Sequence, residues 1–453
     1  MMKKLLAHST LAKAVTLLAL TLLSVLPLSY VGGIADERGA SRSQAAHELA
    51  ESHARAQTAT GAFIVVPYVE RWTEEQPAED GKGRTKVARS RQSAYFVFPE
   101  AAALEGRMTP QERRRGIFAV QFYSLEAQWR GRFGAFDAAS LPHAERNSTI
   151  EAQAPVLAFA VSDVRGLQGR PQATLGGAAA QWQPLVPGLD GRQFGGIHAP
   201  LPPGALKAWQ DQGALDFELK FTLVGQSQFS VVPLAGDNRA HIDSTWPHPA
   251  FGGRFLAARR EVGDAGFDAH WAVSSLASAA RTQFAQLGAA KPPELDTFGV
   301  ALVEPVNVYS MTNRALKYGL LFVALTLLAA FLFELFKGLR LHPVQYGLVA
   351  LALAVFFLLL LALSEKIPFA AAYAAAAAAS VALLAVYFSA VLQGWRRGAG
   401  LASYVAVLYA TLYGLLSSED NALLLGALLL FGLLAVLMIG TRRVDWYALS
   451  ARG

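Results

Sequence analysis

The chain has 453 residues, of which 53% are hydrophobic and 16% are charged, and it contains no cysteine. The absence of cysteine excludes disulfides, thiolate metal sites and cysteine nucleophiles, and the apolar content is too high for an ordinary soluble enzyme. The formal net charge is +6, and several basic residues lie beside apolar segments. The sequence therefore argues against nucleic-acid binding and for a lipid bilayer as a partner.

The apolar residues are concentrated in one run near the N-terminus and in several runs after about residue 315. A helix needs roughly 20 apolar residues to cross the hydrocarbon core of a bilayer. Six runs reach this length, at about 12–33, 317–336, 344–363, 369–392, 401–417 and 422–440. We therefore predict a membrane protein with an α-helical transmembrane bundle of six spans and a large β-rich (α+β) domain between the first two spans.

The third and fourth runs are separated by residues 364–368, which include Glu365 and Lys366. A single helix across both runs would hold these charges near its centre, at a cost of several kcal/mol. Pro368 would also remove a backbone donor from that helix. We therefore expect two spans joined by a tight external turn, with Glu365 and Lys366 at the level of the headgroups.

Basic residues in the short loops indicate the orientation, because Lys and Arg are retained on the cytoplasmic side. One side of the predicted bundle receives Lys3, Lys4, Lys13, Lys337, Arg340, Arg396, Arg397, Arg442 and Arg443. The opposite loops, at 364–368 and 417–421, contain Lys366 as their only basic residue. We predict that both termini lie in the cytoplasm and that residues of about 35–314 lie outside it.

The first apolar run resembles a secretory signal. Small residues at Gly33 and Ala35 would allow cleavage after Ala35, but the run is longer than the usual apolar region of about 7–15 residues. We interpret it as an uncleaved signal anchor. The predicted segments are 1–34, the cytoplasmic N-terminus and signal-anchor helix; 35–314, the external β-rich domain; 315–440, a five-helix transmembrane region; and 441–453, a cytoplasmic tail.

The external segment begins with a polar, Ala-rich stretch at 36–59 that predicts a helical stalk. Runs of β-branched and aromatic residues predict strands at 61–72, 93–99, 116–133, 155–163, 215–225, 228–234 and 296–305, with the polar tract 73–90 as a hairpin loop. Residues 215–223 alternate between apolar and polar, as in an antiparallel strand with one buried face. We expect a sandwich or a layered antiparallel sheet rather than a parallel sheet of strand–helix–strand units.

Residues that could bind a metal are few. His241, His248 and His270, with Asp243 and Asp268 nearby, come closest to a ligand set, but they lack the short spacings that zinc sites usually show. The chain also lacks a nucleophile elbow and a phosphate loop in the required context. We therefore predict no catalytic residues, no cofactor and no metal site.

A second class of function, a transporter or a membrane-embedded enzyme, would depend on acidic residues at the membrane boundary. Glu334 lies three residues before Lys337, so an ion pair between them is the simplest explanation for this acid. Glu365, Glu419 and Asp420 would form the outer rim of such a site. The later spans contain almost none of the mid-span polar residues or Gly/Pro breaks of transporters, and the Ala-rich run 374–379 favours a compact bundle.

Three long stretches of the chain are distinctive. They are "STWPHPAFGGRFLAARREVGDAGFDAHW" (244–271), "MTNRALKYGLLFVALTLLAAFLFE" (311–334) and "LHPVQYGLVALALAVFFLLLLALSE" (341–365). All three closely resemble the CreD family of bacterial inner-membrane proteins. "DER" (36–38), "GAFIVVPY" (61–68), "SSEDNALLLG" (417–426) and "RRVDWY" (442–447) fit the same pattern, so the resemblance covers essentially the whole chain. The chain departs from the family in its Ala-rich fourth span and in Gly–Ala, where the family has Gly–Pro, before "FIVVPY".

The resemblance implies a multi-pass protein of the bacterial inner (plasma) membrane with a periplasmic domain. It implies a role in cell envelope integrity and stress response, linked to a two-component regulatory system. Together with the large β-rich domain and the absence of catalytic motifs, it leads us to expect a non-enzymatic protein whose periplasmic domain binds an envelope protein or polymer. Because no catalytic activity is established for the family, no catalytic residues are implied. The family-signature residues, which we expect to form a structural corner or an interaction surface, are Trp246, Pro247, His248, Pro249, Phe251, Phe255, Arg260, Gly266, Phe267 and Trp271.

Overall fold

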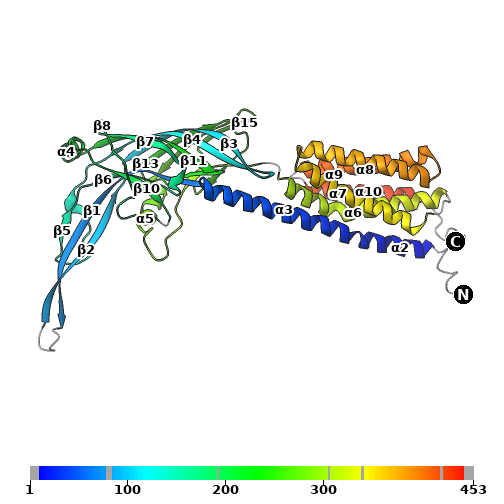
Figure 1. Cartoon of the computed structure of the whole chain (residues 1–453), viewed down its shortest axis with the longest axis horizontal. Helices are drawn as coiled ribbons and strands as arrows, with labels where there is room; N and C mark the ends of the chain where they lie inside the picture. Colours follow the sequence, from blue (N-terminus) through cyan, green and yellow to red (C-terminus); the bar gives the residue numbers. More distant parts are fainter. Residues whose placement is uncertain are drawn as a thin grey trace. The chain divides into compact units, whose positions relative to one another are not determined.

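The chain folds into two compact units (Figure 1). In this computed structural model, residues 10–77, 84–189, 191, 193–304, 307–337, 341–418 and 422–442 are described. The helical unit comprises Met1–Gln44 and Val306–Gly453, and the β-unit comprises Ala45–Pro305. The two ends of the chain thus build the helical unit, and the segment between them builds the β-unit.

The helical unit consists of long apolar helices. They are α2 (Thr10–Leu23), α3 (Val25–Ser52, whose last residues belong to the β-unit), α6 (Val308–Lys337), α7 (Pro343–Ser364), α8 (Phe369–Val391), α9 (Trp395–Ser417) and α10 (Ala422–Thr441). Among the described residues, five helical segments are long and apolar enough to cross a membrane, namely Ala12–Ser52, Val308–Glu334, Pro343–Ser364, Phe369–Val391 and Trp395–Ser417. The predicted helical membrane part is therefore confirmed.

The predicted break at residues 364–368 is present. Helix α7 ends at Ser364 and α8 begins at Phe369, directly after Pro368. Proline is tolerated at the start of a helix because the amide hydrogen that it lacks would have no intrahelical acceptor there. The break keeps Glu365 out of the middle of an apolar helix.

The Ala-rich helix α8 packs closely on α9. Ala372, Tyr373, Ala376 and Ser380 are buried on one face of α8, at the spacing of successive helical turns. The hydroxyl of Tyr373 donates to the backbone oxygen of Tyr409 at 2.7 Å, and a 2.9 Å hydrogen bond joins Ser380 to the Tyr409 hydroxyl. Small residues allow this approach, and the hydroxyl groups buried with them find partners.

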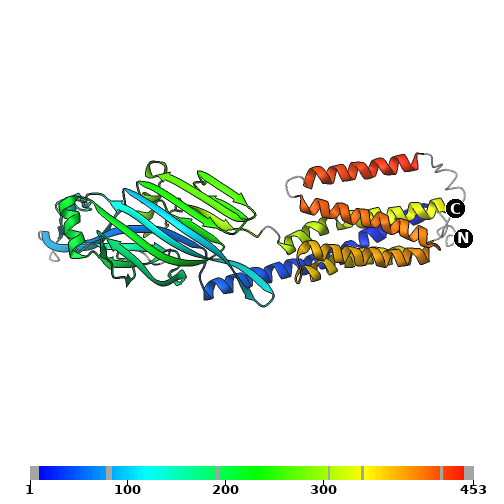
Figure 2. The ribbon, with the colours of Figure 1, turned by 90° about the horizontal axis from the view of Figure 1, so that it is seen from above.

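The β-unit contains two large sheets (Figure 2). The nine-stranded sheet has the order β14 (Pro249–Gly253), β17 (Phe298–Leu302), β12 (Gln228–Val231), β1 (Gln57–Pro77), β6 (Val156–Val161), β10 (Gly195–Pro200) and β9 (Gln183–Pro184), and β2 (Arg84–Val97) and β5 (Thr149–Ala152) also pair with β1. The eight-stranded sheet has the order β15 (Arg259–Gly263), β16 (Gly266–Ser274), β13 (Asp237–Ser244), β3 (Ala101–Arg115), β4 (Phe118–Phe133), β11 (Leu215–Gln226), β7 (Leu167–Leu175) and β8 (Ala178–Ala179). The described residues of the unit also form the α-helices α4 (Pro203–Gln212) and α5 (Ala280–Ala285) and three short 3-10 helices.

The two sheets share one hydrophobic core, as in a β-sandwich. Contacts between aromatic rings join the two sheets at several points. The ring centroids of Phe159 and Phe221 lie 4.8 Å apart, and those of Trp271 and Phe298 lie 5.7 Å apart. Pairing is antiparallel except between β1 and β12 and between β3 and β13, which are parallel. The seven predicted strands are all present, and the sheets are not built from strand–helix–strand units.

The outer faces of the two sheets differ. Helix α5 packs on the outer face of the nine-stranded sheet, where the side chain of Phe284 is 1% exposed. The ring centroid of Phe284 lies 5.2 Å from that of Phe63 and 5.4 Å from that of Phe96. The outer face of the eight-stranded sheet has polar residues at alternate positions of its strands, such as Glu105 and Arg107 on β3.

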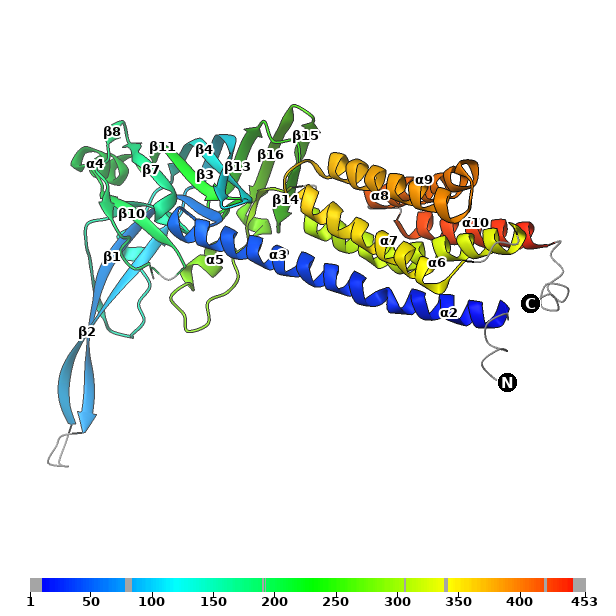
Figure 3. The ribbon, with the colours of Figure 1, turned by 45° about the vertical axis from the view of Figure 1, so that its right-hand side comes forward.

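The prediction of a hairpin loop at 73–90 is wrong. Strands β1 and β2 stay paired as far as Pro77 and Arg84, and Figure 3 shows them projecting as a two-stranded arm. The tract resembles a loop because both of its faces are polar, yet cross-strand ion pairs such as Arg89–Glu74, at 3.0 Å, fit the register. The expected stalk is also shorter than predicted, because the helix ends at Ser52 and β1 begins at Gln57.

Candidate functional site

The outer face of the eight-stranded sheet presents two parallel rows of polar side chains, which we call the polar face. Cross-strand register aligns the first row as Arg259, His270, His241, Glu105, Gln128, Lys220 and Gln172. The second row is Glu261, Asp268, Asp243, Arg107, Glu126, Thr222 and Gln168. Alternate residues of the same strands, such as Ile242 and Phe221, are buried in the core, and this alternation fixes which side chains face outward.

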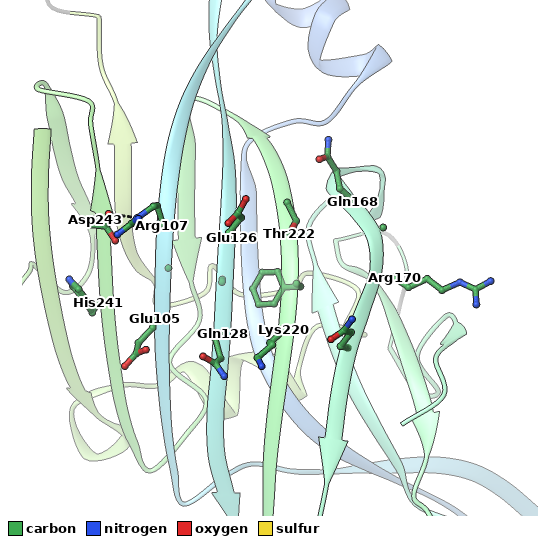
Figure 4. Close-up of a pocket in the computed structure, with 15 residues that line it drawn as sticks. Glu105, Arg107, Glu126, Gln128, Gln168, Arg170, Lys220, Thr222, His241 and Asp243 are labelled. Atoms are coloured by element: carbon green, nitrogen blue, oxygen red, sulfur yellow. Dashed lines mark hydrogen bonds and ion pairs between the residues drawn. The ribbon is translucent and has the colours of Figure 1, made fainter. Parts of the chain in front are cut away.

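The middle of the polar face is hollowed. A shallow cavity of about 710 Å³ lies over β13, β3, β4, β11 and β7. Figure 4 shows Glu105, Gln128 and Lys220 in one row and Arg107 beside Asp243, while the side chain of Arg170 points away. The hollow is therefore lined by carboxylates, amides and cations on adjacent strands.

Some charges of the polar face are paired and others are free to meet a ligand. Arg107 donates to Asp243 at 2.9 Å, and Lys220 pairs with Glu218 at 3.0 Å. Hydrogen bonds from Lys220 and Gln128 hold the pKa of the Glu218 carboxyl below its usual value. Within the described residues, the carboxylates of Glu105 and Glu126 have no hydrogen-bond or ion-pair partner.

One end of the polar face carries a pair of histidines. The rings of His241 and His270 stack at a centroid distance of 4.2 Å with an interplanar angle of 1°. His241 Nε2 forms a 2.8 Å hydrogen bond with one carboxylate oxygen of Asp268, and His270 Nε2 lies 2.9 Å from the other oxygen. The bond from His241 is the main cause that lowers the pKa of the Asp268 carboxyl.

The structure separates His248 from the other two histidines named in the sequence analysis. The backbone oxygen of His248 accepts from Trp246 Nε1 at 3.1 Å, and its ring lies edge-on to Trp246. Antiparallel pairing of β13 and β16, by contrast, puts His241 directly opposite His270. A spacing rule for ligands within one segment misses such a pair, because sheet pairing joins residues that are remote in sequence.

The family-signature residues lie in the loop before β14 and along the chain from β14 to β16. Trp246 also donates from Nε1 to the oxygen of Val303 at 3.1 Å, and this bond ties the loop before β14 to the end of β17. Pro247 and Pro249 flank His248, and Pro249 begins β14. These contacts fix the path of the chain between the two sheets.

The aromatic signature residues form one cluster beneath β14. Phe251 packs edge-on against Phe267 at 5.8 Å and contacts Trp271 at 5.9 Å. The guanidinium of Arg260 lies 5.8 Å from the centre of the Phe251 ring, and Phe255 is partly buried against the same core.

Gly266 is the signature residue with the strictest steric requirement. Its φ angle is +131°, and a Cβ atom there would lie 2.0 Å from the backbone oxygen of Ser244. Only glycine fits such a conformation without strain. Whether the signature residues form a structural corner or an interaction surface stays a prediction.

The membrane-boundary acids are engaged within the helical unit. Glu334 is 3% exposed, and its carboxylate accepts from the ammonium of Lys13 and, at 2.5 Å, from the Tyr346 hydroxyl. Glu365 lies 3.5 Å from Arg38 and accepts from Tyr309 at 3.3 Å. These bonds connect α2, α3, α6 and α7.

Other boundary residues of the predictions are not described by the structure. Glu419, Asp420, Arg340, Arg443, Lys3 and Lys4 lie outside the described residues, as does the side chain of Lys337. The ion pair of Lys13 with Glu334 has no local signal in the sequence, because the two residues are 321 positions apart.

Comparison with known proteins covers both units. The family described as "Inner membrane protein CreD" matches residues 9–447. A protein of Escherichia coli (strain K12) named "Inner membrane protein CreD" is 34% identical over 440 residues, which make up 97% of this chain and 94% of that protein. The order of the apolar helices and the inserted β-unit are thus accompanied by similarity along nearly the whole chain, and the chain belongs to the CreD family of inner-membrane proteins.

Proposed function

We propose that this protein contributes to the integrity of the bacterial cell envelope and to the response to envelope stress, as a non-enzymatic membrane protein with a periplasmic interaction domain. The polar face is the observation that carries the proposal. It is a broad polar surface with free carboxylates and a shallow hollow, whereas the opposite sheet is covered by α5. An open, shallow surface suits the binding of an extended partner better than it suits a chemical reaction, which benefits from a site that excludes water.

The proposed topology has six spans, with both termini in the cytoplasm and residues of about 35–314 in the periplasm. Helix α10, with 20 residues and only apolar or small side chains apart from Thr441, is long enough to be the sixth span. The distribution of basic residues supports the orientation. An uncleaved first helix would keep residues 1–34 as an anchor.

The topology can be tested directly because the chain has no cysteine. Single cysteines replace Lys207 in the β-unit, Lys366 after α7 and Arg396 before α9, all of which are exposed. A membrane-impermeant maleimide added to intact spheroplasts should label the first two cysteines, and Arg396→Cys should react only after lysis. Labelling of Arg396→Cys in intact spheroplasts would overturn the orientation.

We infer that the partner is an envelope polymer that carries carboxylates, amines and hydroxyl groups. The two rows combine acids, bases and amides over seven strands, which complements a polymer with both signs of charge better than it complements an apolar protein surface. Isolated peptidoglycan sacculi are the probe. The full chain in detergent should co-sediment with them, and Glu105→Lys/Glu126→Lys should reduce the bound fraction.

A matched control is Glu112→Lys/Glu151→Lys, which makes the same charge change on exposed residues outside the hollow. Equal binding by the two double variants would contradict a role for the polar face. Cells that carry the Glu105→Lys/Glu126→Lys variant should also lose resistance to detergent relative to the control. An unchanged envelope phenotype after deletion of the whole gene would refute the envelope role itself.

The alternative of a transporter or a membrane-embedded enzyme has less support. Glu334 and Glu365, the described acids on which it would depend, are engaged in ion pairs and hydrogen bonds between helices. A structural role explains these contacts without coupling to an ion. Loss of an uptake or efflux activity in Glu334→Gln, with normal folding, would favour the alternative.

A further inference from the structure

The histidine pair at the end of the polar face forms a cluster with a chemistry of its own. His241 and His270 occupy directly opposed positions on β13 and β16, and Asp268 precedes His270 by two residues on the same face of β16. Each of the three residues offers a ligand atom, and these atoms all lie within 4.8 Å of one another. The side chains are 38–44% exposed, so an ion can reach the cluster from solvent.

The geometry is close to that of a metal site. Zinc binds imidazole nitrogen and carboxylate oxygen at about 2.0–2.2 Å, so tetrahedral ligand atoms lie about 3.4 Å apart. The two histidine Nε2 atoms already lie 2.8 Å and 2.9 Å from the Asp268 oxygens. Small side-chain rotations are therefore enough to turn all three groups towards one ion.

The backbone holds the cluster in place. Strands β3 and β15 flank β13 and β16, so both strands that carry the ligands are hydrogen-bonded on each side. Ile242 and Trp271, which follow the two histidines in sequence, are buried in the core beneath the sheet. Such anchoring lowers the entropic cost of assembling a site.

The neighbouring guanidinium groups have carboxylate partners other than Asp268. Arg259 pairs with Glu261 at 2.6 Å, and Arg107 pairs with Asp243 at 2.9 Å. Arg259 is also near enough to Asp268 for the two charges to interact. The closest partners of the Asp268 carboxylate are the two imidazole rings.

We propose that His241, Asp268 and His270 bind a divalent transition-metal ion of the zinc class. Two imidazoles and one carboxylate are ligands that zinc and its neighbours in the first transition row accept. Three protein ligands leave at least one coordination position open to solvent. That position can take water or an anionic group of a partner lying on the polar face.

Zinc binding by the whole chain tests the proposal. Because the chain contains nine histidines, the protein is purified in detergent with an affinity tag that lacks histidine, and it is freed of metal with EDTA. Titration with Zn²⁺ should reveal one strong site that raises the unfolding temperature. His241→Gln and His270→Gln should each weaken this site at least about tenfold, and His248→Gln, the matched control, should leave it unchanged.

A second readout separates coordination from a simple hydrogen-bonded cluster. Co²⁺ bound by the wild-type protein should give visible absorption bands of a low-coordinate nitrogen–oxygen site, and His241→Gln should abolish them. The variants must unfold at the wild-type temperature in EDTA, so that a lost site is not confused with a lost fold; if one does not, His241→Asn replaces it. Equal Zn²⁺ affinity in the wild type and the His241→Gln/His270→Gln variant would overturn the proposal, as would the absence of a strong site in the wild type.

Discussion

Lys13 in α2 and Glu334 in α6 form an ion pair across 321 residues, and the Tyr346 hydroxyl of α7 binds the same carboxylate. Since Glu334 is 3% exposed, its loss leaves two donors without their acceptor. We expect Glu334→Ala to destabilise the helical unit by on the order of 3 kcal/mol. Thermal unfolding in detergent measures this loss, and Lys366→Ala, in the exposed turn after α7, is the neutral control.

A double-mutant cycle identifies the source of that effect. Lys13→Met and Glu334→Gln should together cost less than the sum of the two single variants, with a coupling of about 1 kcal/mol or more. If the loss of stability in the double variant equalled the sum of the losses in the two single variants, the two side chains would not stabilise each other.

Glu70 makes the β-unit sensitive to acid. Its buried carboxylate accepts from the amides of Ala144 and Glu145 and from the Ser148 hydroxyl at 2.7–2.9 Å, and these bonds lower its pKa below the ordinary 4.5. A lowered pKa gives stability that is fully present above pH 4.5 and is lost as the pH falls through the folded-state value. The unfolding temperatures of wild type and Glu70→Gln should therefore differ at pH 7 and converge below pH 4.5.

The control for Glu70 is Glu151→Gln on the neighbouring strand β5. Glu151 pairs with Arg71 at 2.6 Å, but its side chain is 65% exposed. Solvent weakens such a pair, so the unfolding temperature of this variant should depend on pH as that of the wild type does, within error. A constant difference between wild type and Glu70→Gln at every pH would show that packing rather than ionisation is responsible.

Gly266 and Gly263 lie in the same turn but have different steric surroundings. A methyl group at Gly266 would meet the Ser244 oxygen in a left-handed conformation, whereas a Cβ at Gly263 has no neighbour within 4 Å. Gly266→Ala should destabilise the β-unit by at least about 1–3 kcal/mol. Gly263→Ala should change stability by no more than about 0.5 kcal/mol, as chemical denaturation can verify.

Phe284 determines whether α5 stays on the nine-stranded sheet. It is 1% exposed, with four aromatic rings around it. Phe284→Ala should cost about 3–5 kcal/mol, and Phe284→Leu should cost less because it leaves a smaller cavity. The rate of amide hydrogen exchange at residues 280–285 should be higher in the Phe284→Ala variant than in the wild type. Unchanged exchange there would indicate that other contacts hold the helix.

Sequence patterns predicted elements whose signal is local. The alternation of Leu215, Phe217 and Leu219 identified β11, and the charges at 364–368 identified the gap between α7 and α8. The paired strands of the arm at 73–90 were not predicted, because a strand with two polar faces has the composition of a loop. Strand β3 was not predicted either, because few of its residues are β-branched or aromatic. Its buried Leu104, Gly106 and Met108 do alternate with exposed residues, as in a strand with one buried face.

The candidate sites depend on contacts that local patterns do not contain. The two rows of the polar face require the register of seven strands, and the meeting of His241 with His270 requires the pairing of β13 with β16. Likewise, the signature stretch 244–271 could be quoted as a motif, but its division among three strands depends on β17 and β13 as neighbours. Tertiary pairing, rather than residue type, creates these surfaces.

The strand order has a consequence for how the β-unit is made. Because β1 lies beside β12 and β3 lies beside β13, each sheet can be completed only when its early and its late strands have both been synthesised. Synthesis must therefore proceed to β16 before the eight-stranded sheet is complete and to β17 before the nine-stranded sheet is complete, and such non-local pairing is slow. A premature stop codon anywhere before Gly266 would leave both sheets incomplete rather than remove one lobe of the sandwich.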